Sequence, residues 1–113
     1  CDDCQLVCPW NKFTHHTTEQ DFTIRNSLDS STLIDLFNWT KEEFLKKTEG
    51  SAIRRIGYDA WLRNISIALG NLATSHAVDK KTTQSIIRKL EERKSYPSEI
   101  VREHVEWALL QYA

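Results

Sequence analysis

Three long stretches in the second half of the chain repeat apolar residues at helical spacing. They cover residues 58–74, 79–93 and 97–112, and polar residues lie opposite each apolar side. The last stretch carries a broad stripe of Ile100, Val101, His104, Val105, Ala108, Leu109 and Tyr112. We predict a helix over each range. Pro97 can stand in the first turn of the last helix, because its missing N–H would have no partner there.

Shorter helices are predicted ahead of these three. Apolar residues at helical spacing begin the first of them: Leu33, Leu36 and Phe37. Thr40 and Glu43 then form the T-x-x-E pattern of a capping box, which starts a second short helix. Gly50 would end that helix, and Ser51 can cap a further turn that stops at Gly57.

The first and last long helices match each other at an offset of 40 residues. The matched pairs are Trp61 with Val101, Ile65 with Val105, Ala68 with Ala108, Leu69 with Leu109 and Leu72 with Tyr112. This offset lies in the range of HEAT repeats, about 40–47 residues. Any two amphipathic helices would also align over their apolar positions, so this alternative stays open.

The predicted fold class is all-α, a HEAT-like bundle of about five or six helices over residues 31–113. Its core is expected to centre on Trp61, Ile65, Leu69, Ile86, Leu90, Val105 and Leu109. Residues 1–30 show no sustained period, so we interpret them as an irregular arm and expect them to be the least ordered part. With 113 residues, of which 40% are hydrophobic, the chain can bury one core.

Charge and composition restrict the class of protein. The net charge is −1, with 5 Lys/Arg and 9 Asp/Glu in residues 1–50 and 10 Lys/Arg and 7 Asp/Glu in residues 51–113. Nucleic-acid binding would therefore need a local basic patch in the second half. No apolar run is long enough to span a bilayer and no secretory leader is visible, so we expect a soluble, cytoplasmic monomer.

All three cysteines lie in the first eight residues, as Cys1-x-x-Cys4-x-x-x-Cys8-Pro9. This spacing matches the last three cysteines of the bacterial ferredoxin run, whose thiolates hold [4Fe–4S] clusters. Since a cube needs four thiolates, we expect the remaining ligands upstream, in a longer protein from which this chain was cut. The alternative is a zinc site that His15 or His16 completes, in a helical protein-interaction module.

The cysteine segment, Cys1-Asp-Asp-Cys-Gln-Leu-Val-Cys-Pro-Trp-Asn11, resembles the second cluster motif of the epoxyqueuosine reductase family. Three further strings carry the same resemblance: Thr48-Glu-Gly-Ser-Ala-Ile-Arg-Arg-Ile-Gly57, Trp61-Leu-Arg-Asn64 and Ala68-Leu-Gly-Asn71. It implies a parent oxidoreductase with a cobalamin-binding catalytic domain, a ferredoxin-like part with two [4Fe–4S] clusters and a C-terminal HEAT-like domain. This chain resembles the tail of that parent.

The resemblance further implies that Cys1 and Cys4 serve one cluster and Cys8 the other, with partners from upstream sequence. No catalytic residue falls in this segment, and the parent would reduce epoxyqueuosine in the tRNA anticodon loop. Expressed alone, the chain is expected to hold no intact cluster. Its partners would be the tRNA anticodon stem-loop and the upstream catalytic domain.

Arg54, Arg55 and Arg63 are the candidate tRNA contacts, because guanidinium groups grip phosphates without reading bases. The alternative is a solvated helix face that pairs with Glu49, Asp59 and Asp79. The four tryptophans are interpreted as core residues. We expect His104 to be a partly buried, hydrogen-bonded histidine and not a metal ligand.

Overall fold

The computed structural model describes residues 1–20, 23, 32–75 and 78–113, and all regular structure in these ranges is helical. The elements in chain order are α1 (Asp3–Leu6), the 3-10 helix η1 (Pro9–Phe13), α2 (Leu33–Phe37), α3 (Lys41–Lys47), the 3-10 helix η3 (Ala52–Ile56), α4 (Tyr58–Leu72), α5 (Lys80–Glu92) and α6 (Glu99–Gln111). The described residues contain no strand, which confirms the all-α class. The predicted boundary between residues 30 and 31 lies outside the described residues.

The three long helices are confirmed with small shifts at their ends. α4 ends two residues before the predicted limit, and α5 lies within residues 79–93 as expected. The start predicted for α6 was wrong, because Ser98 occupies its N-cap and Pro97 precedes the helix. The irregular arm also needs correction, since α1 and η1 are two short helical turns within residues 1–20.

Side-chain hydrogen bonds cap the N-termini of the short helices, but the capping box forms at a different helix from the one predicted. The Thr40 hydroxyl accepts a hydrogen bond from the Glu43 amide at 3.2 Å and donates one to the Glu43 carboxylate at 3.5 Å. The second bond of a capping box, from the Thr40 backbone N–H to that carboxylate, is not formed. The reciprocal capping box forms one helix earlier, between Thr32 and Asp35. Ser51 caps η3 as predicted, through the Ile53 amide at 3.3 Å.

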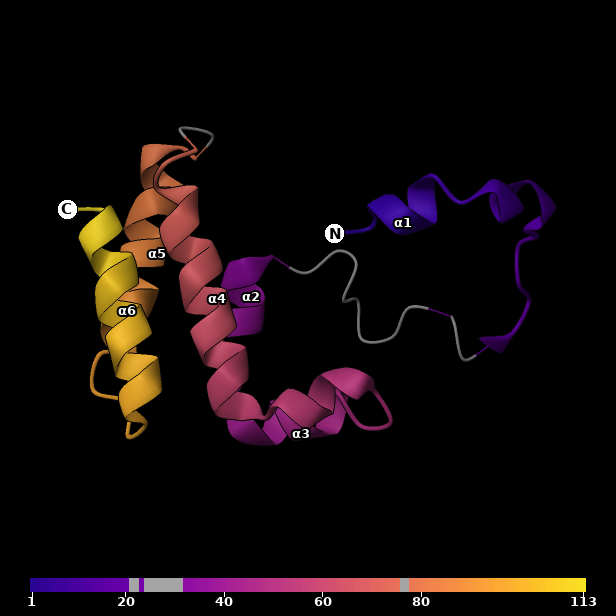
Figure 1. Ribbon diagram of the computed structural model, residues 1–113. Helices are drawn as coiled ribbons and strands as arrows, with labels where there is room; N and C mark the ends of the chain where they lie inside the picture. Colours follow the sequence, from indigo (N-terminus) through magenta and orange to yellow (C-terminus); the bar gives the residue numbers. More distant parts are fainter. Residues whose placement is uncertain (21–22, 24–31, 76–77) are drawn as a thin grey trace.

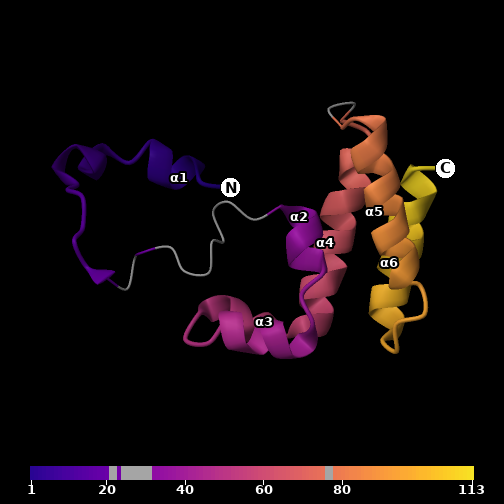
Figure 2. The ribbon, with the colours of Figure 1, turned by 180° about the vertical axis from the view of Figure 1, so that it is seen from behind.

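α4 is the central element of the helical body. α6 packs along it and runs in the same direction, whereas α5 connects them and packs on α6 (Figures 1 and 2). α2, α3 and η3 contact α4 as well. The buried apolar residues are Phe37, Trp39, Phe44, Tyr58, Trp61, Leu62, Ile65, Leu69, Ile86, Leu90, Val101, Val105 and Ala108. This list confirms six of the seven predicted core residues. Leu109 is only partly buried, because it lies at the margin of the α6 stripe.

Two of the four tryptophans are buried, so their assignment to the core was half right. Trp39 and Trp61 stack with ring centroids 5.4 Å apart, and the Trp61 indole N–H donates to the Leu36 carbonyl at 3.2 Å. Trp10 is 73% exposed and Trp107 is 39% exposed. Ile100, which the α6 stripe also included, is 41% exposed. Helical spacing assigned Ile100 to the apolar stripe of α6, but its side chain is not covered by a neighbouring helix as fully as those of Val101 and Val105 are.

Candidate functional site

The cysteine segment folds as two consecutive helical turns. Cys4 lies in α1, and Cys8 is the N-cap of η1, whose first position is Pro9. Pro suits that position because the first N–H groups of a helix have no partner within it. Cys1 and Cys4 are exposed, Cys8 is half-buried, and none of the three is in a disulfide.

Asn11 connects the two turns. Its side-chain amide donates to the carbonyls of Gln5 and Leu6 in α1, and its backbone N–H donates to the Cys8 carbonyl at 3.1 Å. The sequence identified Asn11 only as part of a recognisable string, and its structural role was missed. No pattern of spacing signals a side-chain cap of this kind.

The thiols are available as ligands, but they are not gathered about one point. Within the described ranges no group of three or more His, Cys, Asp or Glu side chains is arranged to hold a metal ion. His15 and His16, which the zinc alternative required, are exposed residues that follow η1. The donor set of Cys1, Cys4 and Cys8 suits soft metals and iron–sulfur clusters, and three thiolates are fewer than the four that even a single cube needs.

The three candidate arginines lie on two elements that contact each other. Arg54 and Arg55 are exposed on η3, and Arg63 is half-buried on α4. Gly57, with φ of +80°, makes the turn between η3 and α4, and η3 packs on α4. The Arg63 guanidinium donates through Nε and Nη2 to the Asn64 side-chain oxygen, at 3.1 Å each. Asn64 thus holds Arg63 in a defined orientation.

Two of the three carboxylates that the alternative paired with these arginines, Asp59 and Asp79, make other contacts. Asp59 accepts a hydrogen bond from the Tyr96 hydroxyl at 3.1 Å, and Asp79 caps α5 through the Thr82 amide at 3.2 Å. Hydrogen bonding to the Thr82 side chain, and then to the Thr82 amide, holds the pKa of Asp79 below its ordinary value. Among the described residues no ion pair joins Arg54, Arg55 or Arg63 to a carboxylate.

Two other arginines have structural roles that the sequence did not indicate. Arg93 donates to the Phe37 carbonyl at 3.2 Å and lies over the rings of Phe37 and Tyr96. Arg102 donates to the carbonyls of Tyr96 and Pro97, at 2.9 Å each. Spacing along the chain could not signal the first contact, because Phe37 lies 56 residues from Arg93.

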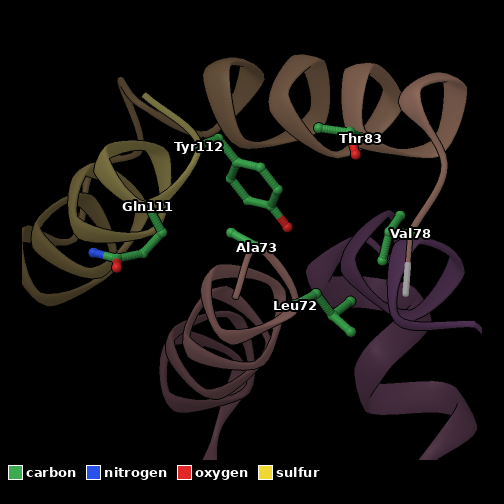
Figure 3. Close-up of a pocket in the computed structure, with 6 residues that line it drawn as sticks. All are labelled: Leu72, Ala73, Val78, Thr83, Gln111 and Tyr112. Carbon is green, nitrogen blue, oxygen red and sulfur yellow. The ribbon is translucent and has the colours of Figure 1, made fainter. Parts of the chain in front are cut away.

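A hollow of about 210 Å³ lies where the ends of α4 and α6 meet the start of α5 (Figure 3). It is lined by Leu72, Ala73, Val78, Thr83, Gln111 and Tyr112. The Tyr112 hydroxyl donates to the Leu69 carbonyl and so joins α6 to α4. Burial raises the pKa of Tyr112. Tyrosine is the only titratable side chain of this lining, which favours a structural role for the hollow.

A second hollow, of about 310 Å³, is lined by Ile67, Glu103, His104 and Trp107. His104 is partly buried, and its Nδ1–H donates to the Ile100 carbonyl at 2.7 Å. This contact confirms the expected hydrogen-bonded histidine. Glu103 makes the surface acidic, which does not favour a phosphate ligand.

The chain is similar to curated proteins named epoxyqueuosine reductase. It is 51% identical over 109 residues to the protein from Pseudomonas aeruginosa, covering 96% of this chain and 28% of that protein. It is 52% identical over 112 residues to the Xanthomonas campestris protein, covering 99% and 29%, and 50% identical over 112 residues to the Escherichia coli protein, covering 98% and 27%. The chain thus spans less than a third of the length of these relatives.

No protein-family model and no solved structure matches the chain. In the parts of the chain that the structure describes, no helix combines the length and the apolar character that crossing a membrane requires.

Proposed function

Because this chain belongs to the epoxyqueuosine reductase family, of whose curated members it spans 27–29%, we propose that it is the C-terminal part of an oxidoreductase that converts epoxyqueuosine to queuosine in tRNA. The observation that carries the proposal is the identity of about half of all residues over nearly the whole chain. The reaction itself would take place on the parent's catalytic domain.

In this proposal Cys1, Cys4 and Cys8 supply part of the ligand set of two [4Fe–4S] clusters, and upstream residues complete it. The free state of all three thiols and the exposure of Cys1 and Cys4 support this role. When bound, the clusters supply electrons to the reductase. Cobalamin would be held by the parent outside this chain.

Arg54, Arg55 and Arg63 would contribute to holding the anticodon stem-loop. Their support is the contact between η3 and α4, together with the absence, among described residues, of ion pairs that would neutralise them. Guanidinium groups in this setting position an RNA backbone without reading its sequence.

The helical body would be a HEAT-like unit. The parallel packing of α4 on α6 supports this, because equivalent helices of successive repeats stack in the same direction (Figure 1). In this contact Gly70 of α4 lies against Ala108 of α6, an offset of 38 residues, which is within two residues of the 40-residue match.

Metal analysis of the full-length parent tests the cluster proposal. Replacement of Cys4 or Cys8 by serine should lower bound iron and sulfide, because the cube that the replaced cysteine serves then lacks a thiolate. The matched control is His15→Ala with His16→Ala, which should leave iron and sulfide unchanged. Bound zinc that disappears in this histidine control would instead establish the zinc-binding interaction module.

The isolated chain provides a second measurement. It should bind far less iron and sulfide than the parent and should be nearly colourless, because it carries three thiolates divided between two sites. About four iron and four sulfide per chain would contradict this assignment of ligands.

A further inference from the structure

Asn11 is the most connected residue of the cysteine segment. Its side-chain amide donates to the carbonyls of Gln5 and Leu6, and its backbone N–H donates to the carbonyl of Cys8. Its own carbonyl accepts from both the amide and the hydroxyl of Thr14, at 3.1 Å and 2.8 Å. One side chain therefore joins the turn that contains Cys4 to the turn that begins at Cys8.

Those bonds meet a physical need of α1. The helix is four residues long, so its last carbonyls have no partner within it. An amide N–H₂ group can donate two hydrogen bonds, and Asn11 directs them to two successive carbonyls. An aspartate of the same shape could only accept hydrogen bonds and would face those carbonyl oxygens with a negative charge.

Packing of apolar side chains in this segment does not reinforce the hydrogen bonds of Asn11. The neighbouring side chains of Leu6, Val7 and Trp10 are 76%, 77% and 73% exposed. No buried packing among them fixes the chain between the two cysteines. The Val7 amide donates to the Asp3 carbonyl at 3.0 Å and so continues α1. Beyond this backbone bond, the position of Cys4 relative to Cys8 depends on the hydrogen bonds of Asn11.

We propose that Asn11 is a positioning residue that sets the geometry between Cys4 and Cys8. This inference rests on the proposed function in one respect: if the two thiolates belong to different clusters, Asn11 also sets how those clusters lie relative to each other. Asn11 itself would touch neither cluster and would act through the two cysteines.

The first experiment needs no metal. Nitroxide labels are attached to Cys4 and Cys8 of the 113-residue chain carrying Cys1→Ser, and low-temperature EPR gives the distribution of distances between them. In Asn11→Asp and Asn11→Leu, the fraction of molecules whose label-to-label distance lies outside the main peak should rise by about five-fold. This factor corresponds to one lost hydrogen bond of about 1 kcal/mol. Asn11→Gln keeps the donor and should lie in between.

Asn71→Asp is the matched control, because it makes the same chemical change at an exposed position of α4. It should leave the distribution unchanged. An unchanged distribution in both Asn11→Asp and Asn11→Leu would overturn the proposal, whatever the parent binds.

The second experiment uses the full-length parent with its clusters reduced. Asn11→Leu keeps all thiolates, so iron and sulfide should stay at the level of the unmodified parent. The magnetic interaction between the two clusters in the EPR spectrum should change, because it depends on their separation. An unchanged interaction would contradict the role of Asn11 in the loaded protein.

Failure of the proposed function is recognised separately. A parent that binds no iron would refute the cluster assignment, while the spin-label distances would still decide whether Asn11 positions Cys4 and Cys8.

Discussion

Gly70 lies directly against Ala108 where α4 and α6 pack together. A Cβ atom added at Gly70 would come within 3.1 Å of the Ala108 Cα and 3.2 Å of its Cβ, and within 2.5 Å of the Trp107 ring. The helices can approach this closely only because both residues are small. Gly70 therefore determines how α6 sits on the central helix.

Replacing Gly70 by alanine should destabilise the fold by up to about 2 kcal/mol. Overpacking a core usually costs about 1–3 kcal/mol. The better helix propensity of alanine returns roughly 1 kcal/mol of that cost. Urea unfolding followed by circular dichroism measures the net effect. The double variant with Trp107→Ala should recover part of the loss, and a Gly70→Ala protein more stable than the original would contradict the packing described.

Tyr112→Phe removes the hydrogen bond from the Tyr112 hydroxyl to the Leu69 carbonyl without removing the ring. This carbonyl lies in the last turn of α4, where helical partners run out. The free energy of unfolding should fall by about 0.5–1.5 kcal/mol. Chemical denaturation gives this value, and amide exchange at the end of α4 should become faster. Equal stability of the two proteins would show that water replaces the bond without cost.

Stability should decline in alkaline solution, in part through Tyr96. Burial, followed by its hydrogen bond to Asp59, raises the pKa of Tyr96 to about 12, whereas an unfolded tyrosine ionises near 10. The folded state therefore keeps its proton longer than the unfolded state, and this contribution is lost as the pH rises from about 10 towards about 12. Tyr96→Phe should lose less stability than the unmodified chain between about pH 9 and about pH 11, in urea titrations at each pH.

Tyr58 provides a comparison for that measurement. Burial also raises its pKa, although the charge of Arg93 opposes the shift. A Tyr96→Phe protein that retains the full alkaline loss would assign the effect to Tyr58 and Tyr112 instead.

Removing the charges of Arg54, Arg55 and Arg63 together should weaken binding to an anticodon stem-loop. Each lost phosphate contact should lower the slope of log affinity against log salt by about 0.7–0.9, similarly for different RNA sequences. Fluorescence titration of the three-fold Arg→Gln variant at several salt concentrations tests this.

The matched control removes three positive charges from α5 and the turn that follows it, at Arg88, Lys89 and Lys94. If the control weakens binding as much as the arginine variant, overall charge is responsible and no local surface is involved. Unchanged affinity in a correctly folded arginine variant would place the RNA surface elsewhere in the parent.

The cysteine positions and the helical ranges were readable from the sequence because they are local properties. Apolar residues at helical spacing predict both a helix and its buried side, and α4 and α5 ended within two residues of the predicted limits. The family resemblance was likewise carried by short contiguous strings. The comparisons confirmed it without any reference to the fold.

The tertiary structure alone decided which of these side chains are covered and with which groups they pair. Periodicity placed Ile100 on an apolar stripe, but burial requires a neighbouring element. Val101, Val105 and Ala108 are buried, whereas Ile100 is 41% exposed. Asp59 binds Tyr96, which is 37 residues away in the chain, and Asn11 reaches back to α1. Such partners are selected by three-dimensional proximity and geometry, which spacing along one helix does not encode.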